Sequence, residues 1–355
     1  MLKIIQIGAK VGPGAGIGKG NPGDTAIGSA FDYVFEKYFP KSTVHFMNCR
    51  QIFTLNDIKK INQYDVLILS GGGLLLHDTF KNSISDWQWG ISKKLIEQIK
   101  IPIIVYSIGY NKFRNQRQFN KKFNETISSL ANKSMFFSLR NTGSCESIKK
   151  HVDQHYHEKI NLNFCPTLIL NKKYKIKKRK TSSVGFVLAS DRLKNRHKNV
   201  NEFANNVRNF VNYLKLKKIQ TVLISHQNDM WISEFVNFDK IIDLYGKNSR
   251  SIYNTYSKID TVVSDRGHAQ MIPFAVGCKI LTPISHDKLL WFLKDMGLEE
   301  FGIEESDPKL FEKLVEKYEK LQNINWKKIH QQKMKFIYQT NDKNTKLIKS
   351  LINKS

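Results

Sequence analysis

The sequence predicts an α/β fold of two similar domains separated by a cleft, with helices at the C-terminal end. Short continuous apolar runs alternate with helical patterns along the chain, which is typical of parallel sheets covered on both faces. This alternation stops at a basic segment, residues 171–182, and then starts again. The length of 355 residues also exceeds the usual size of one domain.

We expect the first domain over residues 1–170. A helical pattern or a polar turn follows each apolar run, as in βαβ units with a parallel sheet. The clearest helix is TAIGSAFDYVFEKYF at residues 25–39, and WQWGISKKLIEQIK at 87–100 also has helical character. The strands are predicted at residues 2–7, around 45, and at 64–73, 101–109 and 135–141.

Residues 171–182, NKKYKIKKRKTS, are polar and basic without periodicity, so we interpret them as a linker, although such a run can also bind nucleic acid. The second domain is expected over residues 183–300, where SVGFVLAS, TVLISHQ, KIDTVVSD and CKILTPI indicate strands. Helices are predicted for NEFANNVRNFVNYLKL, across residues 230–242, for AQMIPFAVG and for DKLLWFLKDMGL. Residues 301–355 are Lys-rich and are predicted to form a helical tail without an evident core face.

Positive charge is in large excess, since 57 Lys and Arg against 31 Asp and Glu give a formal net charge of +26. Such a balance suits an anionic partner, whether nucleic acid, anionic lipid headgroups or a phosphorylated substrate. A solvated, Lys-rich surface explains it equally well, because many of the lysines are interspersed with asparagine. The recognition motifs and interleaved aromatics of nucleic-acid-binding modules are absent, which argues against nucleic acid.

The four cysteines are widely separated, and none forms a C-x-x-C pair or a zinc-type cluster with histidine. We therefore expect a reducing compartment and no metal site. The N-terminal MLKIIQIGAKVG lacks the regions of a signal peptide, and no apolar run approaches the ~20 residues of a membrane span. These features predict a soluble cytoplasmic protein, with contact at the inner face of the membrane left open.

A glycine-rich segment, GAKVGPGAGIGKGNPGDTAIGSAF, follows the first predicted strand. It is not a P-loop, because Pro13 stands where that motif needs its first glycine and Gly20 replaces the magnesium-binding hydroxyl residue. Gly18-x-Gly20-x-x-Gly23 matches the dinucleotide pattern, a weak signal in so glycine-rich a stretch. A turn of this kind near Gly23 still lets an anion approach the backbone N–H groups of a helix start. Asp24 suits the N-cap of that helix, with an acid–base role as the alternative.

Other chemically capable residues also follow predicted strands, where ligands of open parallel sheets bind. LSGGGLLLHD has a tight turn at Gly72 and Gly73 that lets a ligand approach the backbone. SLRNTGSCESIKKH places Arg140 at a strand end and Ser144 at a helix start, an arrangement that suits an anion. His226 follows the strand of TVLIS. The alternatives are a turn without a ligand, a surface arginine beside a capped helix, and hydrogen bonding within a loop.

The strongest cluster is SDRGHA, where Arg266 and His268 stand two residues apart at a strand end. In extended backbone they face the same way, and Gly267 between them leaves room for a ligand. The helix that starts after His268 adds positive potential. The cluster therefore predicts a phosphate or carboxylate site with an imidazole that exchanges a proton near neutral pH, the alternative being a structural histidine.

Five segments share one order along the chain: GNPGDTAI, LSGGGLLLHD, IPIIVYSIGY, FSLRNTGS and SDRGHAQMIPFAVGCKILTPISHDKLLWFLKDMGL. Their motifs and order resemble the polysaccharide pyruvyl transferase family over about residues 18–300. The resemblance implies a GT-B-like fold of two facing Rossmann-like domains. It also implies transfer of the enolpyruvyl unit of phosphoenolpyruvate onto sugar hydroxyls, with release of phosphate. Two positions depart from the family pattern: Cys165 replaces a common Asp before Pro166, and Gly267 replaces a larger apolar residue.

By this resemblance, Arg266 and His268 hold the phosphoenolpyruvate anion together with Arg140 and Lys288, and His268 donates or accepts a proton. The donor is a substrate, so no cofactor is expected, and the acceptor is a surface polysaccharide or its lipid-linked precursor. A GT-B-type glycosyltransferase is the alternative, in which Arg266 and His268 bind the diphosphate of a nucleotide sugar and Asp24 acts as base. A non-catalytic protein that binds polyanions is the third possibility.

Overall fold

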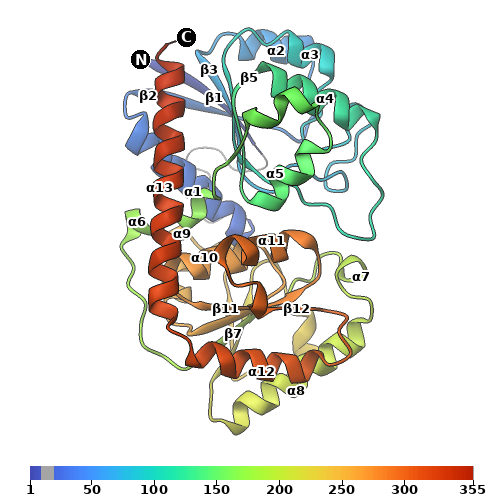
Figure 1. Cartoon of the computed structure of the whole chain (residues 1–355), viewed down its shortest axis with the longest axis vertical. Coiled ribbons are helices and arrows are strands. Elements are labelled where there is room, and N and C mark those ends of the chain that lie inside the picture. Colours follow the sequence, from blue (N-terminus) through green and yellow to red (C-terminus); the bar gives the residue numbers. More distant parts are fainter. Residues whose placement is uncertain (9–19, 355) are drawn as a thin grey trace.

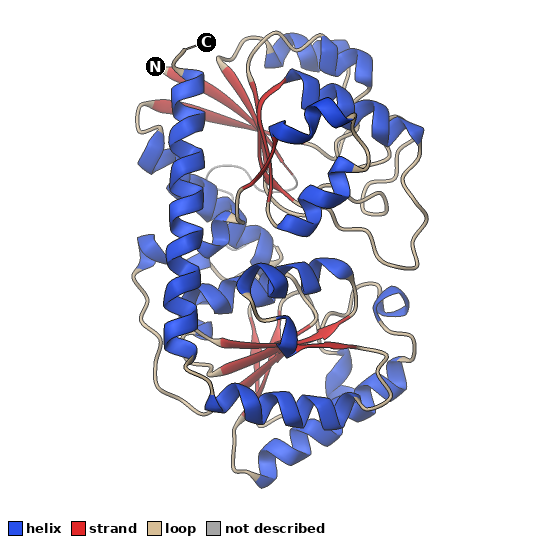
Figure 2. Ribbon diagram, viewed as in Figure 1, coloured by secondary structure: helices blue, strands red, loops and turns tan. Residues whose placement is uncertain are grey.

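The computed structural model describes residues 1–8 and 20–354 and contains two six-stranded sheets, one above the other in Figure 1. All strand pairs in both sheets are parallel. Helices cover the faces of each sheet (Figure 2), as the continuous apolar strands require. The predicted α/β architecture with two facing Rossmann-like domains is confirmed. The glycine-rich residues 9–19, expected to form a strand-to-helix turn, lie outside the described residues.

The first sheet has the strand order β2-β1-β3-β4-β5-β6. Its strands are β1 (Leu2–Gly8), β2 (Ser42–Asn48), β3 (Val66–Ser70), β4 (Ile103–Ile108), β5 (Ser134–Leu139) and β6 (Ile160–Leu162). The helices of this domain are α1 (Pro22–Tyr38), α2 (Leu55–Ile61), α3 (Lys93–Glu97), α4 (Lys121–Lys133) and α5 (Thr142–Lys149). Strands β3 and β4 are buried along their whole length, which explains their unbroken apolar sequence.

The second sheet has the strand order β12-β11-β10-β7-β8-β9. Its strands are β7 (Val184–Val187), β8 (Thr221–Ser225), β9 (Lys240–Asp243), β10 (Thr261–Ser264), β11 (Lys279–Ile284) and β12 (Gly302–Glu304). The helices from the linker onward are α6 (Asn171–Tyr174), α7 (Leu193–Arg196), α8 (Val200–Leu216), α9 (Ser249–Tyr256), α10 (His268–Val276), α11 (Asp287–Met296), α12 (Leu310–Asn323) and α13 (Trp326–Ile352).

Two sequence predictions of secondary structure are wrong. Instead of a helix across residues 230–242, a short 3₁₀ turn at Trp231–Glu234 leads into the edge strand β9. The side chains of β9 are largely exposed, so this strand lacks the apolar run by which the buried strands are recognised. In the predicted helix 87–100, only Lys93–Glu97 is helical. Ser92 caps its start by accepting a hydrogen bond of 3.3 Å from the amide of Leu95, and Trp87 and Trp89 lie fully buried in the loop before it.

Helix α1 begins with Pro22 at its first position, and Asn21 is its N-cap: the Oδ1 of Asn21 accepts a hydrogen bond of 2.8 Å from the amide of Gly23. The expectation that Asp24 caps this helix is therefore wrong, and Asp24 lies in its first turn. The turn after β3 packs closely on α1. A Cβ at Gly71 would lie 2.7 Å from Ile27, and the backbone there has a positive φ of 58°, so glycine is required.

Helix α13 joins the two domains (Figure 1), running beside both of them. Near its start, the indole of Trp326 donates to the carbonyl of Gly277 in the second domain, at 2.9 Å. Near its end, the hydroxyl groups of Thr345 and Tyr106 of the first sheet are 2.8 Å apart. The expectation that the C-terminal residues lack a core face is wrong, since Ile337 and other side chains of α13 are buried.

Candidate active site

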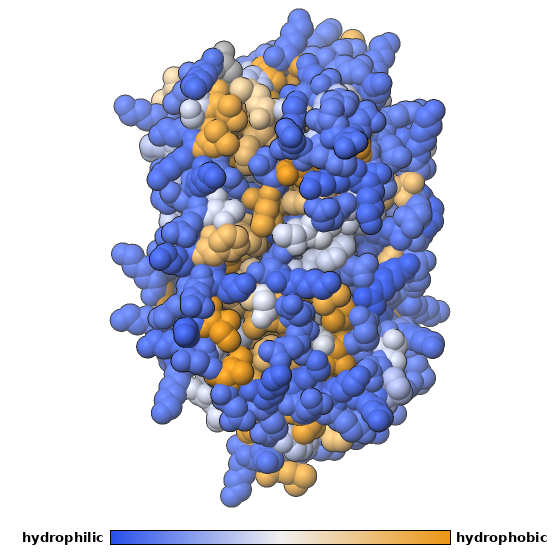
Figure 3. All heavy atoms as spheres, viewed as in Figure 1, coloured by the Kyte–Doolittle hydropathy of each residue, from blue (hydrophilic) through white to orange (hydrophobic). Residues whose placement is uncertain are grey.

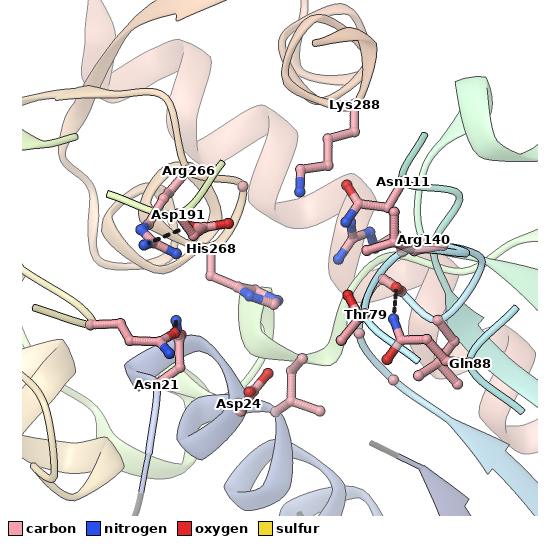
Figure 4. Close-up of a pocket in the computed structure, with 18 of the residues that line it drawn as sticks. Asn21, Asp24, Thr79, Gln88, Asn111, Arg140, Asp191, Arg266, His268 and Lys288 are labelled. Atoms are coloured by element: carbon pink, nitrogen blue, oxygen red, sulfur yellow. Dashed lines mark hydrogen bonds and ion pairs between the residues drawn. The ribbon is translucent and has the colours of Figure 1, made fainter. Parts of the chain in front are cut away.

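A cavity of about 330 Å³ lies between the two domains, at the carboxyl ends of strands from both sheets. Ligands of parallel α/β sheets bind at this edge, because the strand-end loops of both domains converge there. Figure 4 shows His268 near the centre, with Lys288, Arg140, Asp24 and Arg266 placed around it. The residues predicted from sequence that line this cavity are Asp24, Gly72, Gly73, Arg140, His226, Arg266, His268 and Lys288.

Arg140 and Lys288 form a cationic pair without a carboxylate partner among the described residues. Arg140 follows β5, is 4% exposed, and its buried Nε has no hydrogen-bond partner there. The side chain of Arg140 packs directly on Gly109, where a Cβ would lie only 2.3 Å from Nε of Arg140. Burial lowers the pKa of Arg140, and burial together with Arg140 lowers the pKa of Lys288 well below its usual value. The charged forms of both groups are therefore disfavoured without an anion.

Arg266, by contrast, is held by two carboxylates. Its Nε and Nη2 donate to the two carboxylate oxygens of Asp229 at 3.0 and 2.6 Å, and Nη2 lies 2.8 Å from Asp191. Burial alone would lower the pKa of Arg266, but Asp229 and Asp191 raise it above the usual value. Arg266 therefore lines the cavity as a neutralised cation, which the sequence analysis did not anticipate.

The same network reaches across to the first domain. Asp191 also pairs with Arg196 at 3.2 Å and with Arg192 at 2.7 Å. Arg192 in turn donates from Nε and Nη2 to both carboxylate oxygens of Asp78, at 2.7 and 2.9 Å. The cavity thus has one charge-balanced side, around Asp191, and one cationic side, formed by Arg140 and Lys288.

His268 is the first residue of α10 and packs against the start of α1. A Cβ at Gly23 would lie 2.4 Å from its Nδ1, so glycine is needed there for the imidazole to fit. Nε2 lies 3.8 Å from Sγ of the buried Cys165. Burial and then the neighbouring cations, Arg140 first, lower the pKa of His268 well below its usual value. The imidazole is therefore neutral at neutral pH and able to accept a proton.

Of the remaining predicted residues, His226 lies at the cavity and Ser144 does not. His226 is buried beside the cavity, its Nε2 lies 2.5 Å from the hydroxyl of Tyr256, and burial lowers its pKa to about 3. Ser144 does not line the cavity. Its buried hydroxyl accepts a hydrogen bond of 3.1 Å from the amide of Tyr110 and so supports the turn after β4. Within the described residues, no three His, Cys, Asp or Glu side chains gather as a metal site would need.

A family model for polysaccharide pyruvyl transferases matches residues 21–288 of the chain. The chain belongs to the polysaccharide pyruvyl transferase family. The resemblance inferred from the five ordered segments is thus confirmed, and membership makes the protein a transferase. No curated protein matches the chain closely enough to count as a relative. Within its described residues, this family member has no helix with the length and apolar character needed to cross a bilayer.

Solved structures support the GT-B-like fold of this family member. It is similar to a UDP-GlcNAc 2-epimerase from Neisseria meningitidis bound to UDP-GlcNAc, with 14% identity, a TM-score of 0.56, and coverage of 97% of this chain and 100% of that chain. A complex of S. aureus MnaA with UDP has 12% identity, a TM-score of 0.56 and 90% coverage of both chains. An α-glucosyltransferase with UDP has 11% identity, a TM-score of 0.53, and 99% and 100% coverage. At these identities the likeness establishes the fold alone.

Several cavity residues of this family member were not identified from the sequence. One signal for them was present, because Ser-Asp-Arg follows a buried strand twice, at residues 190–192 and again at 264–266. Only the second copy was recognised, although both stand at the same edge of the sheet. Polar cavity residues that were missed include Asn21, Arg50, Thr79, Gln88, Asn111, Asp191, Arg192 and Arg196.

Proposed function

We propose that the protein transfers the enolpyruvyl unit of phosphoenolpyruvate onto hydroxyls of a surface polysaccharide or its precursor, forming a pyruvate ketal. The observation that carries this proposal is the buried Arg140 beside Lys288, without a carboxylate partner among the described residues. Two uncompensated cations in one cavity favour a ligand with more than one negative charge. Phosphoenolpyruvate carries a phosphate and a carboxylate, and its size suits a cavity of about 330 Å³.

The two cations have complementary properties as anion ligands. Arg140 offers a planar fork that matches a carboxylate or phosphate, whereas Lys288 offers a compact point charge. An anion between them would raise the lowered pKa of Lys288 again, so binding is accompanied by proton uptake at high pH. Arg266 contributes less to anion binding than Arg140 and Lys288, because Asp229 and Asp191 already neutralise its charge.

The reaction needs one proton transfer from each of two sugar hydroxyls. In the net reaction the proton of the first hydroxyl passes to the methylene carbon of phosphoenolpyruvate, and the hydroxyl oxygen attacks the oxocarbenium-like centre that this protonation creates. The second hydroxyl displaces phosphate at the same carbon, closing the ketal, and one hydroxyl proton leaves with the phosphate. The neutral imidazole of His268 is the base for the first hydroxyl, because its pKa lies below the working pH. Asp24, which lines the cavity opposite Lys288 in Figure 4, is the candidate for the second proton transfer.

A thermal-unfolding titration with phosphoenolpyruvate tests the proposal. A ligand that binds the folded state alone raises the midpoint, by roughly 2.7 kcal/mol of stability at a hundredfold excess over its dissociation constant. Lys288→Met should abolish this rise without lowering the midpoint of the free protein, because an uncompensated, half-buried cation is removed. Lys294→Met on the same helix, at an exposed position, is the matched control and should keep the full rise.

A nucleotide-sugar donor is the second candidate, because two of the solved structures with this fold are complexes with UDP and with UDP-GlcNAc. UDP-GlcNAc is therefore titrated in parallel with phosphoenolpyruvate. A rise with UDP-GlcNAc that Lys288→Met removes, together with no response to phosphoenolpyruvate, would replace pyruvyl transfer by glycosyl transfer. Phosphate release from phosphoenolpyruvate in the presence of a saccharide acceptor then measures the reaction itself.

A further inference from the structure

The exposed side of α13 and the linker form a strongly basic face. Residues 171–182 contain seven Lys or Arg and no acid, and α13 contains seven Lys and one Asp. These 39 residues account for half of the formal net charge of +26. We propose that this basic face, made of α13 and residues 171–182, docks the protein on an anionic lipid bilayer. The docking does not depend on which donor the cavity binds.

The two segments lie side by side and so act as one surface. The Nζ of Lys172 lies 3.9 Å from the centre of the Tyr338 ring on α13. Further along, a Cβ at Gly277 would contact both Lys178 of the linker and His330 of α13, at 3.6 and 3.7 Å. Figure 1 shows the chain after α6 running down beside α13. The linker charges therefore add to those of the helix.

Most charges of the basic face are uncompensated, with Lys173 of the linker pairing with Glu36 at 2.6 Å. Asp342 is the single acid of α13, and it pairs with Lys37 at 3.2 Å and with Lys346 at 2.7 Å. The other exposed lysines of the helix have no ion pair among the described residues: Lys327, Lys328, Lys335, Lys343 and Lys349. A bilayer with anionic headgroups complements such a surface, and each basic residue near it contributes roughly fivefold in affinity.

Large apolar side chains stand among these lysines. Phe336 is 49% exposed and Leu347 is 46% exposed. They are eleven residues apart, close to three helical turns, so both point to the same side of α13 as Lys343. Orange patches break the blue surface along the course of α13 in Figure 3, which has the orientation of Figure 1. Exposed apolar residues within a basic helix face are the features by which interfacial helices bind membranes.

The shape and composition of the face favour a bilayer over nucleic acid. The 27 residues of α13 extend for about 40 Å along both domains, which suits contact with a surface. Thirteen of the fourteen cations are Lys, whereas nucleic-acid sites favour Arg for bidentate contacts. Leu347 has no stacking role on bases, but it can enter the acyl boundary of a membrane.

Co-sedimentation of the full chain with lipid vesicles tests this inference. The protein should bind vesicles of phosphatidylcholine with phosphatidylglycerol, and should not bind vesicles of phosphatidylcholine alone. A triple variant of exposed residues on α13, Lys328→Glu, Lys335→Glu and Lys343→Glu, should lower binding by roughly a hundredfold or more. Phe336→Ser with Leu347→Ser should lower it by roughly tenfold.

Matched controls separate the basic face from net charge alone. Lys59→Glu, Lys60→Glu and Lys94→Glu change the charge equally at exposed positions on α2 and α3, and this variant should retain binding. Leu216→Ser, at an apolar position that is 85% exposed on α8, should also retain it. Equal loss in both triple variants, or binding to neutral vesicles, would overturn the inference. So would binding of a double-stranded DNA through the α13 lysines by a protein that does not bind vesicles.

Discussion

Replacing Cys165 by Asp should raise the lowered pKa of His268 back toward its ordinary range. Sγ of Cys165 lies 3.8 Å from Nε2 of His268, and its side chain is fully buried. Burial lowers the pKa of His268 most, and the cations Arg140 and Lys288 lower it further. The thiol itself carries no charge, because burial raises its pKa. A carboxylate at this position would therefore give His268 a very different titration.

The size of the effect follows from this geometry. A carboxylate within about 4–6 Å of an imidazole raises its pKa by roughly 1–3 units. The change corresponds to about 1.4–4 kcal/mol of differential stabilisation of the charged form. Such a shift would bring the pKa of His268 back toward the ordinary range near neutral pH. The substitution also places a negative charge near Arg140, so it should weaken the binding of phosphoenolpyruvate.

The pKa of His268 can be measured by NMR titration of its Cε1–H signal in the natural chain, Cys165→Asp and Cys165→Ser. The serine variant has a similar size and no charge, so it should titrate like the natural chain. In Cys165→Asp the acidic limb of kcat/KM should move to higher pH by the same amount as the NMR pKa, since the base is then protonated. An unchanged His268 titration in Cys165→Asp would refute the electrostatic reasoning. A shifted titration with an unchanged pH profile would exclude His268 as the base.

Two further predictions concern stability. Asp229→Asn should lower the free energy of unfolding by about 3–5 kcal/mol, because Arg266 then keeps only the partly exposed Asp191 of its two carboxylate partners and its pair with the fully buried Asp229 is broken. Urea unfolding measures this, and a loss below about 1 kcal/mol would contradict the structural importance of the pair. Stability should also fall as the pH drops below about 6.5, by up to about 1.4 kcal/mol per pH unit for each histidine kept neutral in the folded state. The histidines whose pKa burial lowers most are His226, His268 and His286. Unfolding midpoints between neutral and mildly acidic pH check this, and a profile that stays flat also in a variant lacking the opposing His197 would contradict it.

His197 acts in the opposite direction on the loss of stability at low pH. Burial lowers the pKa of His197, but hydrogen bonds to Asp265 and Glu305 raise it above the usual value. A group whose pKa is raised in the folded state contributes stability at low pH and loses it as the pH rises through that value. His197 therefore offsets part of the acid destabilisation. His197→Gln should steepen the loss of stability on acidification.

The convergence of the site could be predicted from the sequence because parallel strands end at one edge of a sheet. Arg140 follows β5 and Lys288 follows β11, and the rule for parallel α/β sheets places both at the cleft without any knowledge of coordinates. The hydrophobic pattern also predicted the fully buried strands, because their apolar runs are continuous. It failed at β9, since an exposed edge strand has no such run.

Pairing between loops could not be predicted, because it depends on distances between distant segments. Arg266 seemed an open cation in SDRGHA, yet Asp229 after β8 and Asp191 after β7 both contact it. The N-cap of α1 was misassigned for a local reason. Asn21 and Asp24 are both good caps, and the deciding signal was Pro22, which favours the first position of a helix.

The cationic side of the cavity carries an electrostatic cost that the ligand can remove. Arg140 belongs to the first domain and Lys288 to the second, and Arg140 lowers the pKa of Lys288 across the cleft. Ion pairs elsewhere hold the domains together against this repulsion. Arg192 pairs with Asp78, and Arg114 contacts Asp287 at 2.7 Å and Glu304 at 2.5 Å. Because an anion between the two cations would relieve the repulsion, donor binding and closure of the cleft should favour each other by the same free energy.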